Sequence, residues 1–225
     1  MVDYKIVRSN RKSVAIYVTR DAKVEVRAPF DYPAEKIEAS VRDKQAWIAE
    51  KLALHEERLA KKESFSLFYG GTALLFGEEV SLTERAGQSF GYDGECFYFP
   101  PGLAEEQIRD CLIQVYKSIA KNYFTGRVLH FAEIMGVMPC AVKVTSAKTS
   151  WGSCSSRDSI NFSWRLVMAE KELIDYVVVH ELAHVREKNH SAAFWAEVGK
   201  VLPDYAVLRE GLKGLARRLI EEVWE

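Results

Sequence analysis

The feature that most constrains this 225-residue chain is a pair of histidines four residues apart, His180 and His184, with Glu181 directly after the first. In an α-helix, residues four apart lie on one face about one turn apart, so both imidazoles can reach a single metal ion. Glu181 lies about 100° further around the same helix, where its carboxylate reaches a water beside the metal rather than the metal. The pattern therefore predicts a helix that carries two ligands and a base.

A third histidine, His190, follows His184 by six residues. Six residues is too far for the same face of a straight helix, so we expect the helix to end near Lys188 or Asn189. Asn189 suits this position because asparagine tolerates the left-handed conformation that often terminates a helix. His190 is then the natural third ligand.

Three protein ligands leave a fourth position on zinc for water, whose pKa there falls to about 7. We therefore predict a zinc-dependent hydrolase in which Glu181 is the general base that activates the zinc-bound water. The predicted zinc ligands are His180, His184 and His190. The other two histidines, His55 and His130, lie in charged or amphipathic runs, where a surface or half-buried imidazole is usual.

Several segments around these residues resemble the YgjP-like metallopeptidases, and the beginning of the chain is similar to that family's amino terminus. The segments are KTSWGSCSS at 148–156, INFSWRL at 160–166, YVVVHELAH at 176–184, NHSAAFW at 189–195 and YKIVRSNRKSV at 4–14. The resemblance covers nearly all of the chain. It implies a zincin-type catalytic domain related to SprT-like and WLM proteases, with the same three histidines as zinc ligands and Glu181 as catalytic residue.

Other zinc families share parts of this pattern. Metzincins place glycine where this chain has Glu187 and carry a Met-turn downstream, but no methionine follows Met168. Three-histidine endoribonucleases lack an acid beside the first ligand. Peptide deformylase adds an upstream cysteine ligand, for which Cys154 is the candidate here, but His190 makes a cysteine ligand unnecessary. Glu181 favours a peptidase. The alternatives are a metal-dependent non-peptidase hydrolase of endoribonuclease or deformylase type, and a zinc-bound binding module without turnover.

Residues near the motif have candidate supporting roles. Arg165 and Tyr176 are candidates for stabilising the oxyanion that forms during amide hydrolysis. Glu197 either accepts an N–H from a ligand imidazole or faces solvent. Cys154 is most simply a small buried thiol, with a redox or inhibitory role as the alternative. Three nearby tryptophans are expected to pack in the core around the site: Trp151, Trp164 and Trp195.

Composition agrees with a cytoplasmic enzyme. The chain has 31 basic and 32 acidic residues and a net charge of −1, which gives no general attraction to nucleic acid or to an anionic membrane. The cluster of Lys213, Arg217 and Arg218 is expected to be the solvated face of a terminal helix. Four scattered cysteines predict reduced thiols, and no apolar run approaches the ~20 residues that a membrane crossing requires. The expected partner is a peptide or protein substrate.

The predicted fold class is α+β, with an amino-terminal α+β lobe at residues 1–101 and a zincin-like catalytic domain at 102–225. Residues 3–30 alternate β-branched and polar positions and predict two or three antiparallel strands. One long helix is expected over 31–63 and a return to strand over 65–99. A Pro-Pro-Gly run then marks the boundary between the lobes.

The second lobe is expected to begin with a helix and to continue with strands that lead into the motif helix. The expected elements are a helix over 103–134, β-rich segments over 141–146 and 159–168, the motif helix near 170–188, a short helix capped by Ser191 and a final helix after Pro203. The strands lie just before the motif helix in sequence. Their sheet edge is a candidate site for holding a peptide substrate as an added strand.

Overall fold

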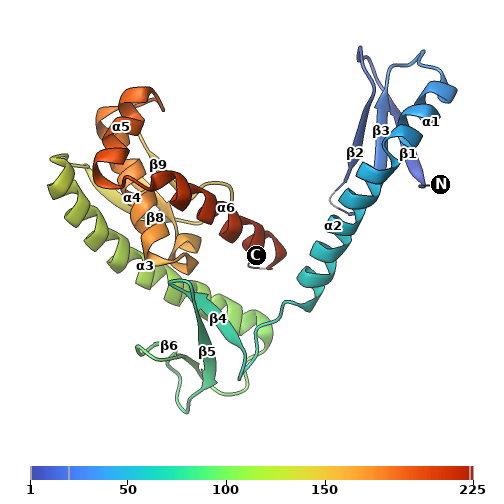
Figure 1. Cartoon of the computed structure of the whole chain (residues 1–225). Helices are drawn as coiled ribbons and strands as arrows, with labels where there is room; N and C mark the ends of the chain where they lie inside the picture. Colours follow the sequence, from blue (N-terminus) through green and yellow to red (C-terminus); the bar gives the residue numbers. More distant parts are fainter. Residues whose placement is uncertain (1, 20, 223, 225) are drawn as a thin grey trace. The chain divides into compact units, whose positions relative to one another are not determined.

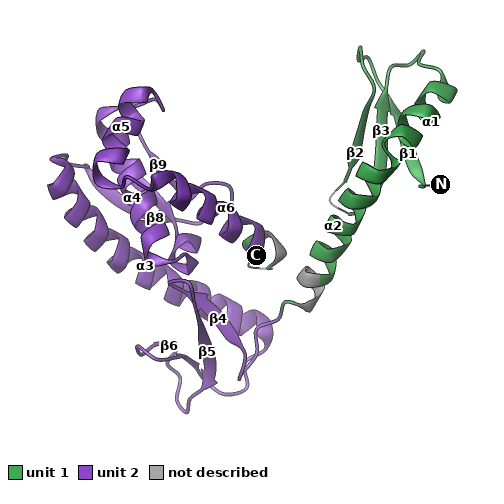
Figure 2. Cartoon of the chain, viewed as in Figure 1, with its two compact units in different colours: residues 1–65, 219–223, 225 green, residues 66–218, 224 purple. Residues whose placement is uncertain are grey.

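The computed structural model describes residues 2–19, 21–222 and 224. The chain divides into two compact units (Figure 2). Unit 1 comprises the described residues of 1–65 and 219–222, and unit 2 comprises 66–218 and Trp224. None of the described helices is long and apolar enough to cross a membrane.

Unit 1 is a three-stranded sheet with two helices (Figure 1). The strands β1 (Tyr4–Arg8), β2 (Ala15–Val18) and β3 (Val24–Ala28) lie in the order β1-β3-β2. The antiparallel prediction is confirmed for β2 with β3, but it is wrong for β1, which pairs with β3 in parallel. The reason is that β3, whose alternate residues are buried, occupies the centre and separates the other two strands.

The single helix expected over residues 31–63 is two helices, α1 (Ala34–Asp43) and α2 (Gln45–Ser64). They are separated at Lys44, whose φ of −102° and ψ of 13° depart from helical values. No proline or glycine marks this position, so the local sequence does not reveal the break. Residues from both helices share one core with β3, which consists of Val24, Val26, Ala28, Ile37, Val41 and Ile48.

Unit 2 begins with a four-stranded sheet and a long helix. The strands β4 (Thr72–Leu75), β5 (Glu78–Glu84), β6 (Gly91–Tyr92) and β7 (Phe97–Phe99) lie in the order β4-β5-β7-β6, and α3 (Glu105–Met135) follows. The helix ends at Gly136, whose φ of 62° is the left-handed conformation that glycine adopts without strain. The strands predicted over 65–99 and the helix predicted over 103–134 are therefore confirmed.

The predicted lobe boundary at residue 101 falls inside unit 2, whereas the compact units divide after residue 65. The first sheet of unit 2 is bonded to elements that follow residue 101. The Tyr116 hydroxyl of α3 donates to the carbonyl of Leu74 at 2.6 Å, and the Phe76 N–H donates to the carbonyl of Val167 at 2.9 Å. The Pro-Pro-Gly run is thus a turn within one packed unit.

A second sheet in unit 2 precedes the motif helix. Its strands β8 (Ala141–Thr145), β9 (Gly152–Cys154) and β10 (Ser159–Ser163) lie in the order β8-β10-β9, so β9 is an edge strand. The prediction of β structure over 159–168 is confirmed for β10 and wrong for the remainder, because Trp164–Met168 is a 3₁₀ helix, η1. All five residues of η1 are buried, and a short apolar run of this kind does not distinguish strand from helix by its periodicity.

The remaining elements of unit 2 are helical, as predicted. They are α4 (Lys171–Arg186), α5 (Ala192–Val201) and α6 (Tyr205–Glu221). The Ser191 hydroxyl caps α5 by accepting the Phe194 N–H at 3.3 Å. Arg127 of α3 donates to both carboxylate oxygens of Asp175 on α4, at 2.6 and 2.7 Å, which fixes α4 against the longest helix of the chain.

Candidate metal centre

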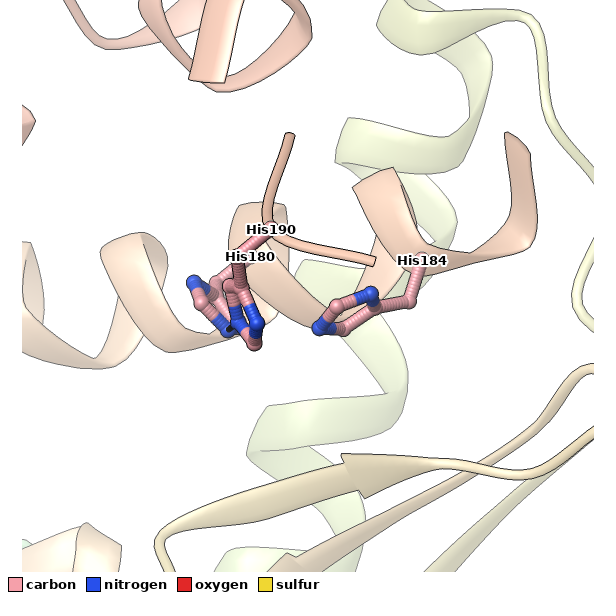
Figure 3. Close-up of side chains that lie close together, drawn as sticks. All are labelled: His180, His184 and His190. Atoms are coloured by element: carbon pink, nitrogen blue, oxygen red, sulfur yellow. Dashed lines mark hydrogen bonds between the residues drawn. The ribbon is translucent and has the colours of Figure 1, made fainter. Parts of the chain in front are cut away.

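The three predicted ligand histidines lie close together in unit 2 (Figure 3). His180 and His184 project from one face of α4, and the chain after that helix turns back to bring His190 to them. Nε2 of His190 lies 3.0 Å from Nε2 of His180. One possible ligand atom from each histidine lies within 4.8 Å of the others. The histidine spacing that the sequence singled out thus corresponds to a spatial cluster.

The turn between α4 and His190 differs from the prediction. The helix ends at Arg186, earlier than expected, and Glu187 is extended with φ −118°. The left-handed conformation expected at Asn189 is wrong, because Asn189 is not among the described non-glycine residues with positive φ. A tertiary contact supports this turn instead: Lys188 Nζ donates to the Asp158 carboxylate, from the turn between β9 and β10, at 2.5 Å.

Burial favours the neutral forms of His180 and His184. Burial, together with the neighbouring His184 and His190, lowers the pKa of His180 to about 4. Burial also lowers the pKa of His184. Nδ1 of His184 lies 3.0 Å from the Glu187 carbonyl, which only accepts, so Nδ1 carries the proton and the lone pair is left on Nε2. Neutral imidazoles are the form that binds a metal ion.

Glu181 is the buried acid of the site. Glu181 is 5% exposed, and burial raises the pKa of its carboxyl group to about 7. Among the described residues, neither Glu181 Oε2 nor His180 Nδ1 has a hydrogen-bond partner. Buried polar atoms without partners are uncommon and are expected where a further group binds. Together with three convergent imidazoles, they fit a divalent metal ion and its water.

The backbone of Gly152, in the edge strand β9, lies close to the Glu181 side chain. A Cβ atom added to Gly152 would lie 2.7 Å from both Cγ and Oε1 of Glu181, so only glycine leaves room for this carboxylate. Gly152 lies within the motif KTSWGSCSS, but the sequence alone does not reveal its contact with Glu181. The contact depends on how β9 packs against α4.

A pocket of about 330 Å³ adjoins His180 and Glu181. Its walls come from α4, from α6 and from β9 with the residue before it. The lining residues are Trp151, Gly152, Tyr176, Val177, His180, Glu181, Arg209, Leu212, Lys213 and Ala216. Lys213 is exposed, as predicted, but it also borders this pocket, and Arg209 is a lining residue that the sequence analysis missed. The spacing of Arg209 and Lys213 places them on one face of α6, which the sequence can indicate. That this face lines the pocket depends on tertiary packing.

The two candidate oxyanion residues lie in different places. Tyr176 lines the pocket, and its ring centroid lies 5.8 Å from that of His180. Arg165 is buried, donates to the carbonyls of Ser146 and Ala147 at 3.3 and 3.4 Å, and is not among the lining residues of the described pocket. These bonds give Arg165 a role in holding the loop before β9.

Two other candidates also have defined contacts. Glu197 accepts from Arg186 at 2.9 Å and pairs with Lys200, so neither the imidazole contact nor a freely solvated carboxylate describes it. Cys154 is half-buried, and burial raises the pKa of its thiol. A raised pKa favours the unreactive thiol form over the thiolate.

The tryptophans differ in position as well. Core packing is confirmed for Trp164, which is fully buried and stacks on Tyr116 with ring centroids 5.7 Å apart. It is wrong for Trp151, which is half-buried and lines the pocket. Trp195 is also half-buried, and its ring centroid lies 5.9 Å from that of His180. Two aromatic rings therefore border the site, where the sequence predicted only core.

A mixed α+β chain with a helix that presents clustered histidines beside a pocket has the features of a metallopeptidase. The chain belongs to the YgjP-like metallopeptidase family, because the family model for that metallopeptidase domain matches residues 12–214. Membership of this family makes peptides or proteins the substrate class and implies a divalent metal.

Comparison with known proteins adds one partial structural match. The crystal structure of the metallopeptidase zymogen of Pyrococcus abyssi abylysin matches with 26% sequence identity and a TM-score of 0.38. The match covers 40% of this chain and 90% of that chain. No curated protein matches the chain.

Proposed function

We propose that this metallopeptidase is zinc-dependent, with His180, His184 and His190 as the zinc ligands and Glu181 as the general base. The observation that carries the proposal is the convergence of one possible ligand atom from each histidine within 4.8 Å, beside a buried carboxylate. Three imidazoles are a common ligand set for catalytic zinc. Zinc in such a site acts as a Lewis acid and lowers the pKa of water to about 7.

Glu181 is suited to moving protons during peptide hydrolysis. A group whose pKa lies near the working pH both accepts and returns a proton readily, and burial raises the pKa of Glu181 to about 7. Its Oε1 lies against the Gly152 backbone, whereas its Oε2 has no partner among the described residues. Glu181 therefore takes a proton from the attacking water and delivers it to the leaving amine.

The edge strand β9 is proposed to bind the substrate. One side of β9 pairs with β10, and Gly152 and the preceding Trp151 line the pocket beside Glu181. An extended peptide added to such an edge is held by main-chain hydrogen bonds, which do not depend on its sequence. The substrate backbone would then run alongside the catalytic carboxylate.

Family membership favours peptide hydrolysis over the endoribonuclease and deformylase-like alternatives. A deformylase-type centre also needs a cysteine ligand, and the metal-binding group found among the described residues consists of histidines alone. A binding module without turnover is the alternative that the enzymatic tests below address.

The first test is the zinc content of the purified protein by elemental mass spectrometry. Wild type is expected to hold about one zinc per chain, and His190→Ala is expected to bind zinc at least about tenfold more weakly. His130→Ala is the matched control, because His130 is exposed on α3 and outside the cluster. Equal zinc affinity in wild type and His190→Ala would move the third ligand elsewhere.

The second test separates catalysis from metal binding. Glu181→Gln is expected to keep zinc but to cleave a peptide pool about 10²- to 10⁴-fold more slowly than wild type, as loss of a general base does. Turnover at the wild-type rate in Glu181→Gln would remove Glu181 from the mechanism. Zinc-loaded wild type that cleaves no peptide would favour the binding module.

A further inference from the structure

The pocket beside the metal centre has two basic residues that the proposed mechanism does not use, Arg209 and Lys213. Both belong to α6, where the lining positions are 209, 212, 213 and 216. This spacing of i, i+3, i+4 and i+7 is one continuous face of a helix. The part of the pocket wall that α6 forms thus has two apolar residues, Leu212 and Ala216, beside two cations.

One close contact joins α6 to α4. A Cβ atom added to Gly211 would lie 2.9 Å from Leu173 Cδ2 of α4, so the absence of a side chain lets the two helices approach. Leu173 is itself buried. This contact places α6 beside the helix that carries His180 and Glu181.

Arg209 is oriented by an aromatic ring and interacts electrostatically with the adjacent Glu210, but it forms no ion pair in the described part of the chain. Its guanidinium lies over the Trp195 ring, 5.6 Å from the centroid, and Trp195 neighbours His180. In the part of the chain that the structure describes, no carboxylate lies within ion-pair distance of Arg209. Arginine in this state retains its five donors for a carboxylate, which it binds through a planar fork.

Lys213 has only a weak partner. Its ammonium lies 2.7 Å from Glu210 Oε1, and the side chains of this pair are 57% and 59% exposed. Glu210 is not among the lining residues, and an exposed pair of this kind contributes little free energy. A substrate carboxylate can therefore compete for Lys213 at small cost.

The other lining residues do not neutralise the positive charge of Arg209 and Lys213. The one acidic residue among the lining residues is Glu181, which belongs to α4 and the catalytic centre. Trp151, Tyr176 and Val177 supply mainly apolar surface between the two ends. A substrate group that fits has a short apolar stem and a negative end.

We propose that this pocket is a specificity subsite for a carboxylate of the peptide substrate, bound by Arg209 and Lys213. The carboxylate is either an aspartate or glutamate side chain near the scissile bond or the carboxyl terminus of the peptide. The proposal rests on the proposed peptidase function for its substrate, but it is tested by binding and does not require turnover.

The test measures peptide binding to the full-length, zinc-loaded Glu181→Gln protein by isothermal titration calorimetry. The peptides are decapeptides of neutral background with one glutamate at successive positions, a matched glutamine series, and a neutral peptide with a free or amidated carboxyl terminus. The best glutamate peptide, or the free terminus, is expected to bind on the order of tenfold more tightly than its neutral match. A preference in the glutamate series assigns the side chain, and a preference for the free terminus assigns the peptide end.

Substitutions then test which residues cause the preference for acidic peptides. Arg209→Gln and Lys213→Gln, each made in the Glu181→Gln protein, are expected to reduce the acidic-to-neutral affinity ratio by roughly threefold or more. Arg217→Gln is the matched control, because it removes the same charge one turn further along α6, outside the lining residues, and it should leave the ratio unchanged.

Three outcomes would overturn the subsite. They are equal binding of acidic and neutral peptides, binding of neither, and an equal fall in the ratio for Arg217→Gln, which would indicate a general charge effect. Failure of the proposed function looks different. Zinc-loaded wild type would then cleave no peptide, whatever the affinity ratio in Glu181→Gln.

Discussion

Among the described residues, the core of unit 1 consists of apolar side chains, whereas unit 2 also buries Ser163, Arg165 and Glu181. The glycines follow the same division. Residues 1–65 contain none of the 13 glycines of the chain, and all of them lie between positions 70 and 214. The core of unit 1 thus contains no glycine, whereas unit 2 also uses glycine backbone that other groups approach closely.

This difference between the units shows that the candidate site requires buried polar groups and close backbone contacts in unit 2. Burying a charged group is unfavourable, and the surrounding core must compensate for that cost. In unit 2, Gly152 lets a strand touch Glu181, and Gly211 lets α6 approach α4. Both positions serve the candidate site, so the second unit gives up local stability for geometry.

The largest expected effect comes from the same substitution in each core. Ile37 in unit 1 and Ile174 in unit 2 are both fully buried, and replacing either with alanine is expected to lower the free energy of unfolding by about 2–5 kcal/mol. Thermal unfolding and zinc titration would measure the two variants. Ile174→Ala is expected to weaken zinc binding, because Ile174 is a buried residue of α4, the helix that carries His180 and His184, whereas Ile37→Ala should leave zinc affinity within about twofold.

This pair of variants can break the comparison. Zinc affinity that falls equally in both variants would mean that the metal centre depends on unit 1 as much as on its own unit. An unchanged zinc affinity in Ile174→Ala would mean that the centre tolerates a cavity beside the helix that carries it.

The next effect concerns the pH dependence of stability. Burial raises the pKa of Glu181 to about 7, above the value of about 4.3 for an exposed glutamate. Between these values the folded state binds more protons than the unfolded state, so the free energy of unfolding falls as pH rises. Without metal, Glu181→Gln is expected to match wild type near pH 4 and to be more stable by about 3 kcal/mol at pH 8.

Urea denaturation in a chelating buffer across this pH range would measure the effect. A stability gain of Glu181→Gln that grows with pH would support the contrast between the units, because it would show that the buried charge of Glu181 lowers the free energy of unfolding of unit 2. A gain that is constant with pH would indicate that the substitution acts through packing.

The smallest of these effects tests backbone approach. Gly152→Ala is expected to displace the Glu181 carboxylate and to lower kcat roughly 10- to 100-fold while zinc stays bound, since misplacing a catalytic group is costly even at short range. Steady-state peptide hydrolysis and elemental analysis would measure both. Gly126→Ala on α3 is the matched control, because an added Cβ meets nothing within 4 Å there, and it should leave kcat unchanged. Full activity in Gly152→Ala would show that the carboxylate does not need this contact.

Much of the secondary structure was predictable, because helix and strand periodicity are local properties. The helices at α3, α4, α5 and α6 follow from apolar spacing and from caps such as Ser191. The misses arise where a distant contact decides. The break at Lys44 has no local signal, the centre of the first sheet is taken by its most buried strand, and Trp164–Met168 is helical although its apolar run also fits a strand.

The sequence by itself determined the local arrangement of the proposed catalytic motif. The spacing of His180, Glu181 and His184 within one helix fixes their relative directions, because a helix turns by a constant angle per residue. The family resemblance follows from the same motifs and is confirmed.

Only the tertiary structure decided what surrounds that motif. It brought Gly152 against the carboxylate and Arg209 and Lys213 to the pocket wall, and it placed Arg165 outside the lining residues. These contacts join residues from separate elements. Their geometry depends on how strands and helices pack, and no local spacing encodes it.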